Sequence, residues 1–275
     1  MFRVEDLDKA RCKPHYLPNI IDDLNWFGLQ WEYGPGGTDV NQQEYSPEFG
    51  YFEQSKRMDI YLAAWRVLYE GGFIYPSPHS RRDVAMALSA PHDSDNHDPI
   101  FPPSLRPAPD LLPKGLSGPG KVNWRFRVPD KTVSFVDNYA GQQAFIGGVH
   151  FGDFLVWRSD GFPSYELAVV VDDAAMGITE VVRGCDLLKS TARQLLLYEA
   201  LGYTHQIPEW FHCPLVCDEN GVRLAKRNKP ASIRNLRYPE GTAAGLVHVV
   251  MWPIVCIAII TCITDITTFV SPYIY

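Results

Sequence analysis

The sequence predicts an α/β fold, because two apolar runs of strand length are followed by an amphipathic helix. Residues 167–171 form an unbroken apolar run rich in β-branched residues, which is typical of a strand buried on both faces of a parallel sheet. Residues 178–182 predict a second strand. Apolar residues then recur at helical spacing over residues 190–201, with Ser190 as a helix cap and Gly202 as the end of the helix.

Polar side chains follow both predicted strands. Asp172 and Asp173 come directly after the first strand, Arg183 follows the second, and Tyr165 precedes the first. In open α/β sheets ligands bind beyond the carboxyl ends of the strands, so we expect these four residues to meet at one edge. The alternative is that the two aspartates only cap a loop and that Arg183 pairs with one of them.

Composition limits the protein class. The 275 residues are 46% hydrophobic, enough for one large or two small domains with a core. The formal net charge of −7 argues against indiscriminate nucleic-acid binding, so any such contact must come from a local basic patch. The six cysteines form no Cys-x-x-Cys pair and no signal-peptide pattern precedes them, so we expect reduced thiols in a cytoplasmic protein.

The N-terminal part predicts alternating elements. Residues 2–7 predict a short strand, and residues 19–27 a helix that ends at Gly28. Residues 33–50 are rich in glycine and polar residues and predict a loop. Residues 54–72 predict a helix with an apolar, partly aromatic stripe that belongs to the core.

The middle of the chain predicts short strands around a proline-rich linker. Strand patterns cover residues 73–75, 122–128, 133–136 and 153–157. Between the first two, residues 91–120 contain a proline every few positions, which prevents long regular structure.

The motifs in residues 164–202 carry a family resemblance. They contain Tyr-x-Leu-Ala-Val-Val-Val-Asp-Asp, Gly-Ile-Thr and Val-Arg-Gly-x-Asp-Leu. This pattern resembles the catalytic domain of glutamyl-tRNA synthetases, which are class I enzymes, and is nearest to their short relatives, the glutamyl-queuosine tRNA(Asp) synthetases. Asp186-Leu187-Leu188 stands where full-length glutamyl-tRNA synthetases usually have Glu-x-His, which favours the short branch.

The resemblance implies an architecture. We expect a class I, Rossmann-like catalytic core over residues 1–240, with an inserted α+β subdomain over about residues 73–155 that contacts tRNA. Residues 241–275 form an atypical hydrophobic tail.

The resemblance also implies a set of site residues. Arg3-Val4-Glu5-Asp6-Leu7-Asp8 matches a family motif in which the glutamate, here Glu5, binds the amino group of the substrate amino acid. Tyr165 and Arg183 would bind other polar groups of the substrate, whereas Asp172 and Asp173 receive no separate role. Arg223, Ala225 and Lys226 stand in the family's KMSKS-like loop, in which Lys226 keeps a lysine and Arg223 replaces one, so both are candidates to neutralise the ATP phosphates.

The function implied by the resemblance is ATP-dependent activation of glutamate, with Mg²⁺ accompanying ATP, and transfer to the queuosine base of tRNA(Asp). We expect a monomer without membrane attachment. Two alternatives stay open: a fragment of an ordinary glutamyl-tRNA synthetase, and a non-catalytic remnant that binds glutamate or tRNA. The remnant is considered because the family's HIGH-like motif normally precedes the segment that begins here at Arg3.

A zinc site of the family is not expected in this chain. Many members hold zinc through three cysteines and a tyrosine, and the equivalent positions here are Ser77, His79, Phe101 and Leu105. Tetrahedral zinc needs four donor side chains, which this set does not supply. His79 with His92 and His97, or His212 with Cys213 and Cys217, are weaker metal candidates, and we interpret the latter as a strand with buried thiols.

Residues 246–263 are almost wholly apolar and just short of the roughly 20 residues that cross a bilayer as a helix. A membrane anchor and an altered C-terminal sequence both explain this run, and we favour the altered sequence.

Overall fold

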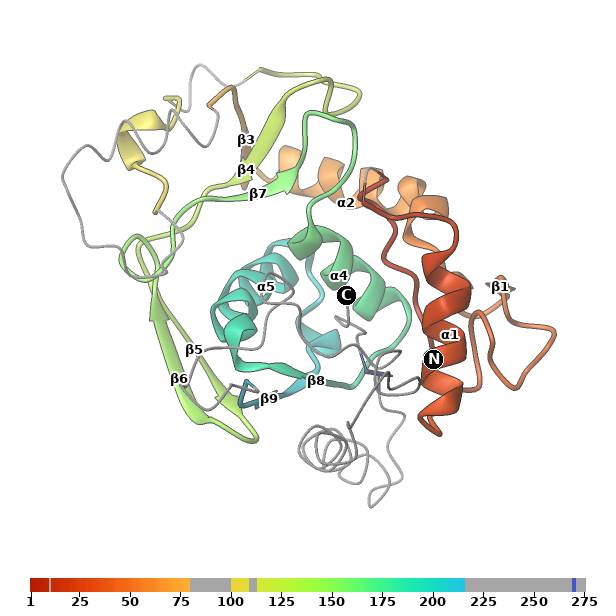
Figure 1. Cartoon of the computed structure of the whole chain (residues 1–275). Helices are drawn as coiled ribbons and strands as arrows, with labels where there is room; N and C mark the ends of the chain where they lie inside the picture. The colour runs from red at the N-terminus through yellow and green to blue at the C-terminus, as the bar shows by residue number, and fades with distance from the viewer. Residues whose placement is uncertain (10, 80–99, 109–112, 216–268, 271–275) are drawn as a thin grey trace, which may run out of the picture. The chain divides into compact units, whose positions relative to one another are not determined.

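The computed structural model describes residues 1–9, 11–79, 100–108, 113–215 and 269–270 (Figure 1). The chain forms two compact units. Unit 1 combines Met1–Gln54, Ile178–Asp186 and Pro208–Tyr275, and unit 2 combines Ser55–Gly177 with Leu187–Ile207. Each unit is therefore assembled from segments that are distant in the sequence.

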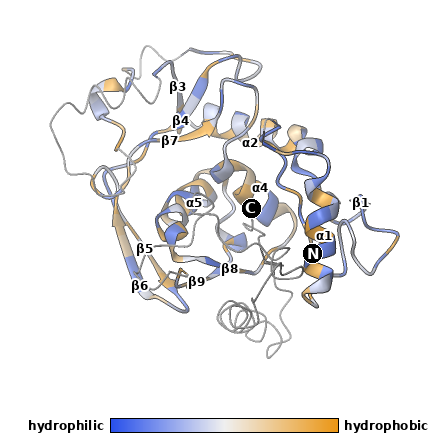
Figure 2. Ribbon diagram, viewed as in Figure 1, coloured by the Kyte–Doolittle hydropathy of each residue, from blue (hydrophilic) through white to orange (hydrophobic). Residues whose placement is uncertain are grey.

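Unit 1 contains a parallel sheet around β8 (Glu180–Gly184). Strand β8 pairs in parallel with β9 (Glu209–Cys213) and with β10 (Phe269–Val270). Helix α1 (Tyr16–Trp26) buries only Leu24 and shows mixed hydrophilic and hydrophobic positions (Figure 2). A two-stranded ribbon, β1 (Tyr45–Ser46) and β2 (Gly50–Tyr51), interrupts the predicted loop.

The N-terminal segment of unit 1 is extended but is not a strand of a sheet. It forms a single parallel bridge between Val4 and Glu53, with backbone hydrogen bonds from Val4 N to Phe52 O and from Gln54 N to Val4 O. The predicted strand over residues 2–7 is thus reduced to one bridge.

In the described part of unit 2, three helices pack with an antiparallel sheet. The helices are α2 (Met58–Glu70), α4 (Tyr165–Ala175) and α5 (Leu188–Leu201). The sheet has the order β3 (Ile74–Ser77), β4 (Asn123–Phe126), β7 (Phe154–Trp157), and these strands lie side by side in Figure 1. Strands β5 (Thr132–Asp137) and β6 (Gly141–Ile146) form a hairpin. Among the described residues, the 3-10 turns η2 (Pro103–Leu105) and η5 (Thr204–Gln206) lie in unit 2, whereas η1 (Gln54–Lys56) and η4 (Cys185–Leu187) each cross the boundary between the two units.

Aromatic packing holds α2 against the sheet. Trp65 of α2 meets Trp124 of β4 edge to face, with ring centroids 5.0 Å apart. Phe126 and Phe154 stack across β4 and β7 at 5.2 Å. These rings are buried, so they exclude water over a large apolar area and dominate the stability of this layer. The predicted aromatic stripe is confirmed as core.

The strand predicted over residues 167–171 is wrong, because this run lies in α4. Ser164 caps the helix, its hydroxyl accepting a hydrogen bond from Leu167 N. Every residue from 166 to 174 is buried, so the helix lacks the exposed polar face that would make polar residues recur every three or four positions. An apolar run of this kind does not distinguish a buried strand from a buried helix.

The elements that follow α4 are largely as predicted. Residues 178–182 contribute to β8, and the next helix ends at Gly202 with the left-handed φ of 75° that glycine adopts without strain. Ser190 does not cap that helix: it lies inside α5, and the N-cap residue is Leu187.

The remaining predicted strands are confirmed as β3, β4, β5, β7 and β9. The run that we interpreted as a strand with buried thiols is β9, but its buried residues are Trp210 and His212, while Phe211 and Cys213 are half-buried. Within the proline-rich stretch, residues 100–108 hold the short turn η2.

Several predictions fall outside the described residues, namely those on Arg223, Lys226, His92, His97, Cys217 and residues 246–263. Among the helices that the structure describes, none combines the length and apolar character needed to cross a membrane.

Candidate active site

Glu5 lies in the extended N-terminal segment of unit 1, beside Arg3. Arg3 Nη2 is 3.2 Å from Glu5 Oε1, and the side chain of Arg3 is 0% exposed while that of Glu5 is 16% exposed. A buried guanidinium restricts the rotamers of the carboxylate that it contacts. Glu5 is thus a positioned, half-buried carboxylate, suited to accept hydrogen bonds from an ammonium group.

Arg183 occupies the carboxyl end of β8, the end at which parallel strands place ligands. Its Nε donates a hydrogen bond to His212 Nε2 on β9, at 3.0 Å. Sequence reasoning missed His212 as a partner. The pairing follows from the parallel register that places Arg183 opposite His212, and this register is not visible in either strand alone.

Asp172 does not follow a strand, which corrects the predicted position of this residue at a strand end. It belongs to α4, is 0% exposed, and accepts hydrogen bonds from Arg57 Nε at 2.8 Å and from the Tyr61 hydroxyl at 2.8 and 3.0 Å. Asp173 is buried in the same helix, also away from a strand end. The expected pairing of an aspartate with an arginine exists, but the arginine bound to Asp172 Oδ1 is Arg57.

Tyr165 is the first residue of α4 and is half-buried. The neighbouring Glu166 fixes this end of the helix, because its carboxylate accepts hydrogen bonds from Ser190 Oγ at 2.8 Å and Gln194 Nε2 at 2.9 Å. Arg193 Nη1 lies 3.6 Å from the same carboxylate. Four polar side chains therefore join the first turn of α4 to α5 and hold the backbone of Tyr165 in place. This network was not predicted.

The residues at the family's zinc positions do not fit a zinc ion. Ser77 Oγ accepts a hydrogen bond from Arg125 Nε at 3.2 Å, and the Arg125 guanidinium lies 4.3 Å from the centroid of the Phe101 ring. Leu105 packs against the apolar pair of Tyr75 and Phe101. A guanidinium cation and an apolar cluster cannot coordinate Zn²⁺. Within the described ranges, no group of three or more His, Cys, Asp or Glu side chains has the geometry to hold a metal ion.

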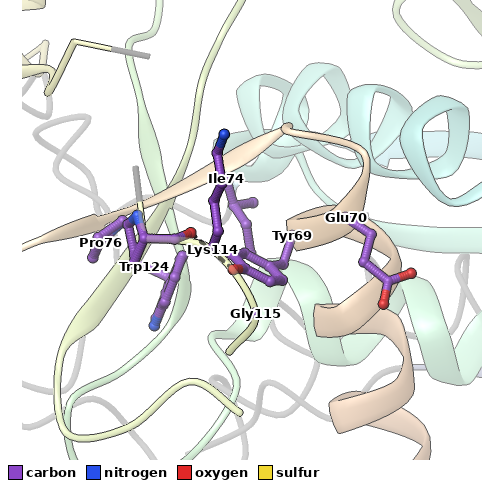
Figure 3. Close-up of a pocket in the computed structure, with 8 residues that line it drawn as sticks. Tyr69, Glu70, Ile74, Pro76, Lys114, Gly115 and Trp124 are labelled. Atoms are coloured by element: carbon purple, nitrogen blue, oxygen red, sulfur yellow. Dashed lines mark hydrogen bonds between the residues drawn. The ribbon is translucent and has the colours of Figure 1, made fainter. Parts of the chain in front are cut away.

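A separate cavity of about 300 Å³ lies in unit 2 (Figure 3). Its walls come from α2, β3, β4 and residues 113–115, and the Tyr69 hydroxyl donates a hydrogen bond to Pro113 O at 2.8 Å. None of the predicted site residues that the structure describes lines this cavity.

Comparison with known proteins places these features in a family. The model of the catalytic domain of class I tRNA synthetases (E and Q) matches residues 1–242. The glutamyl-Q tRNA(Asp) synthetase of Symbiobacterium thermophilum is 41% identical over 238 residues, which are 86% of this chain and 70% of that protein. The protein of the same name from Nitratidesulfovibrio vulgaris is 40% identical over 252 residues, 90% of this chain and 73% of the relative.

Solved structures support the fold. A glutamate-tRNA synthetase from Elizabethkingia anophelis superimposes with a TM-score of 0.63 at 24% identity, over 86% of this chain and 46% of that one. The chain thus spans about half of that solved protein, whose similarity shows the catalytic-domain fold alone. The resemblance carried by the motifs is confirmed: this chain belongs to the family of class I tRNA synthetases (E and Q).

Proposed function

We propose that this chain activates glutamate with ATP and transfers the glutamyl group to the queuosine base of tRNA(Asp). The observation that carries the proposal is the 40–41% identity to proteins named glutamyl-Q tRNA(Asp) synthetase, over at least 70% of their length. The family match over residues 1–242 includes Glu5, Tyr165 and Arg183, so it covers the residues proposed to bind glutamate.

The described side chains suit this substrate. Glutamate carries one ammonium and two carboxylates, and the carboxylate of Glu5 complements the ammonium. Arg183 supplies a planar guanidinium, which binds carboxylates through two parallel hydrogen bonds. The Tyr165 hydroxyl is able to donate to a further oxygen of the substrate.

Activation requires no nucleophilic side chain. An oxygen of the substrate carboxylate attacks the α-phosphorus of ATP in line with the departing pyrophosphate, so one P–O bond forms as another breaks. Transfer to tRNA then releases AMP. Positioning and charge neutralisation carry such a step, and we assign phosphate contact to Lys226 and Arg223. Mg²⁺ is expected to enter with ATP.

We also propose how the chain is divided into domains, where it is located and in which state it acts. We assign residues 1–240 to the catalytic domain, with a tRNA-contacting insertion at about 73–155 and a distinct tail at 241–275. The family consists of enzymes acting on tRNA in the cell interior, so we place this chain in the cytoplasm, without zinc and as a monomer.

Two measurements on the 275-residue chain test the proposal. The first is glutamate-dependent exchange of pyrophosphate into ATP, with and without tRNA. The second is transfer of labelled glutamate to tRNA(Asp) that contains queuosine, compared with tRNA(Asp) that lacks it and with tRNA(Glu). We expect exchange without tRNA, and labelling of the queuosine-containing tRNA alone.

Other outcomes separate the alternatives. Labelling of tRNA(Glu) would identify an ordinary glutamyl-tRNA synthetase activity. A folded chain that binds glutamate but gives no exchange would be a non-catalytic remnant, and the proposal would then be wrong.

A further inference from the structure

The pair formed by Arg183 and His212 joins two adjacent parallel strands. The two residues are register partners on β8 and β9, so their side chains leave the same face of the sheet. Both are buried, at 9% and 1% exposure, and the Nε–Nε2 distance is 3.0 Å. A hydrogen bond of this length between buried groups has a defined geometry and is costly to leave unmade.

The direction of the hydrogen bond defines the chemical state of His212. The guanidinium Nε carries a hydrogen and donates it, so His212 Nε2 must offer a lone pair. The ring is therefore neutral, with its proton on Nδ1. A protonated imidazole would present an N–H and a positive charge to Arg183, which would remove the hydrogen bond and repel the guanidinium.

The same hydrogen bond fixes the orientation of Arg183. The guanidinium is planar, and anchoring Nε sets both the plane and the direction in which Nη1 and Nη2 extend. These two nitrogens form the fork that meets a carboxylate in bidentate pairs. An arginine held in this way loses less side-chain entropy on binding than one that rotates about its long stem.

We propose that His212 is a positioning residue, which holds Arg183 in the orientation that binds a carboxylate of glutamate. This inference rests on the proposed function, because it takes Arg183 as a ligand of glutamate. It assigns His212 a role through Arg183 and no contact with the reacting atoms.

Histidine NMR tests the geometry without any substrate. Long-range ¹H–¹⁵N spectra of the full chain report which ring nitrogen carries the proton, and the His212 signals are assigned by their loss in His212→Gln. We expect the Nδ1-protonated tautomer. His150 provides an internal contrast, since its Nδ1 accepts a hydrogen bond from Ile146 N at 2.8 Å and its proton must lie on Nε2. An Nε2-protonated His212 would overturn the inference.

Kinetics test the role. In His212→Leu, which lacks an acceptor, the KM for glutamate should rise about tenfold, the loss expected for one hydrogen bond at a binding residue, while the KM for ATP and kcat stay within about twofold. In His212→Gln an amide oxygen can accept from Nε, so the increase should be at most about threefold. His150→Gln is the matched control and should leave all three parameters unchanged.

The outcomes distinguish this inference from the proposed function. An unchanged glutamate KM in His212→Leu, or equal increases for glutamate and ATP, overturns the role of His212 alone. If the wild-type chain shows no exchange, calorimetric glutamate affinity replaces KM in the same comparison. A wild-type chain with neither exchange nor glutamate binding overturns the proposed function and this inference together. Should His212→Leu not fold, His212→Gln and the tautomer still decide the question.

Discussion

Asp172 is completely buried between Arg57 and Tyr61, so its charge is used within unit 2. A carboxylate in a binding site keeps lone pairs directed at a ligand. The carboxylate of Asp172 instead accepts hydrogen bonds from Arg57, the N-cap residue of α2, and from the Tyr61 hydroxyl in α2. Asp172 is consequently a stabilising feature of α4. The residues we assign to the substrate, Glu5 and Arg183, are also held by neighbouring side chains: Arg3 lies beside Glu5, and Arg183 donates a hydrogen bond to His212.

Substitution of Asp172 separates a structural role from a catalytic one. Asp172→Ala leaves the buried Arg57 without this partner and should lower the free energy of unfolding by about 3–5 kcal/mol, measured by urea denaturation at neutral pH. Asp160 forms a half-exposed pair with Arg158, and Asp160→Ala should cost less than about 1 kcal/mol. Loss of activity in Asp172→Ala with unchanged stability would contradict the structural assignment.

The buried hydroxyl of Tyr75 should make the stability of the fold depend on pH in the alkaline range. Burial, together with the hydrogen bond to Asp153, raises the pKa of Tyr75 well above its ordinary value of 10.0. The unfolded chain therefore releases this proton first, so the contribution is complete below pH 10.0 and is lost as the pH rises above that value. Each such tyrosine adds a slope of up to about 1.4 kcal/mol per pH unit.

Urea unfolding from about pH 9 to pH 11 measures this slope. In Tyr75→Phe the free energy of unfolding should fall less steeply with pH than in the wild type, because one proton fewer is released on unfolding. Its stability at pH 7 should be lower, because the hydrogen bond to Asp153 is gone. Tyr139→Phe, at an exposed turn of the β5–β6 hairpin, should decline as the wild type does. Parallel curves of unfolding free energy against pH for Tyr75→Phe and the wild type would show that Tyr75 has the same pKa in the folded and the unfolded chain, which would contradict this prediction.

Secondary-structure elements differ in how far the sequence determines them. Strand β8 could be predicted because β-branched residues end at a polar Arg-Gly pair, and the end of α5 because Gly202 adopts a positive φ. Helix α4 could not, because total burial removes the periodicity that identifies a helix. Glu5 and Arg183 could be found from motifs. The pairing of Arg183 with His212 could not, since it depends on the register of two strands, and neither could the contact of Arg57 with Asp172, 115 residues apart, which depends on tertiary packing.

The segment containing η2 is held by side chains in a way that requires no metal. Arg106 donates to both oxygens of the buried Asp153 at 2.7 Å, and Arg125 lies over the Phe101 ring. We expect the purified chain to contain far less than one zinc per molecule by elemental analysis, and a chelator to leave its melting temperature unchanged. Stoichiometric zinc, or a chelator-induced fall in melting temperature, would contradict this prediction.

At the scale of the whole molecule, neither unit is a continuous stretch of chain. The backbone passes between unit 1 and unit 2 at residues 54–55, 177–178, 186–187 and 207–208. The sheet strands β8 and β9 of unit 1 are joined through α5 of unit 2, so unfolding of α5 replaces an ordered crossover by a flexible loop and raises the entropic cost of pairing these two strands. Unfolding of α5 therefore lowers the stability of the β8–β9 pair.

This connectivity predicts one cooperative transition that glutamate shifts as a whole. Far-ultraviolet circular dichroism and tryptophan fluorescence should give coincident melting curves for the full chain. Because ligand that binds only the folded state stabilises it, glutamate at about 100 times its Kd should add about 2.7 kcal/mol to the free energy of unfolding and move both melting curves together.

Glu5→Gln loses the anion proposed to bind the ammonium group and should show little shift of the melting curves at the same glutamate concentration. Aspartate serves as the matched ligand control, since its shorter side chain places the second carboxylate differently. Two separate transitions, with only one moved by glutamate, would show that the units unfold independently and would assign glutamate to the unit that shifts.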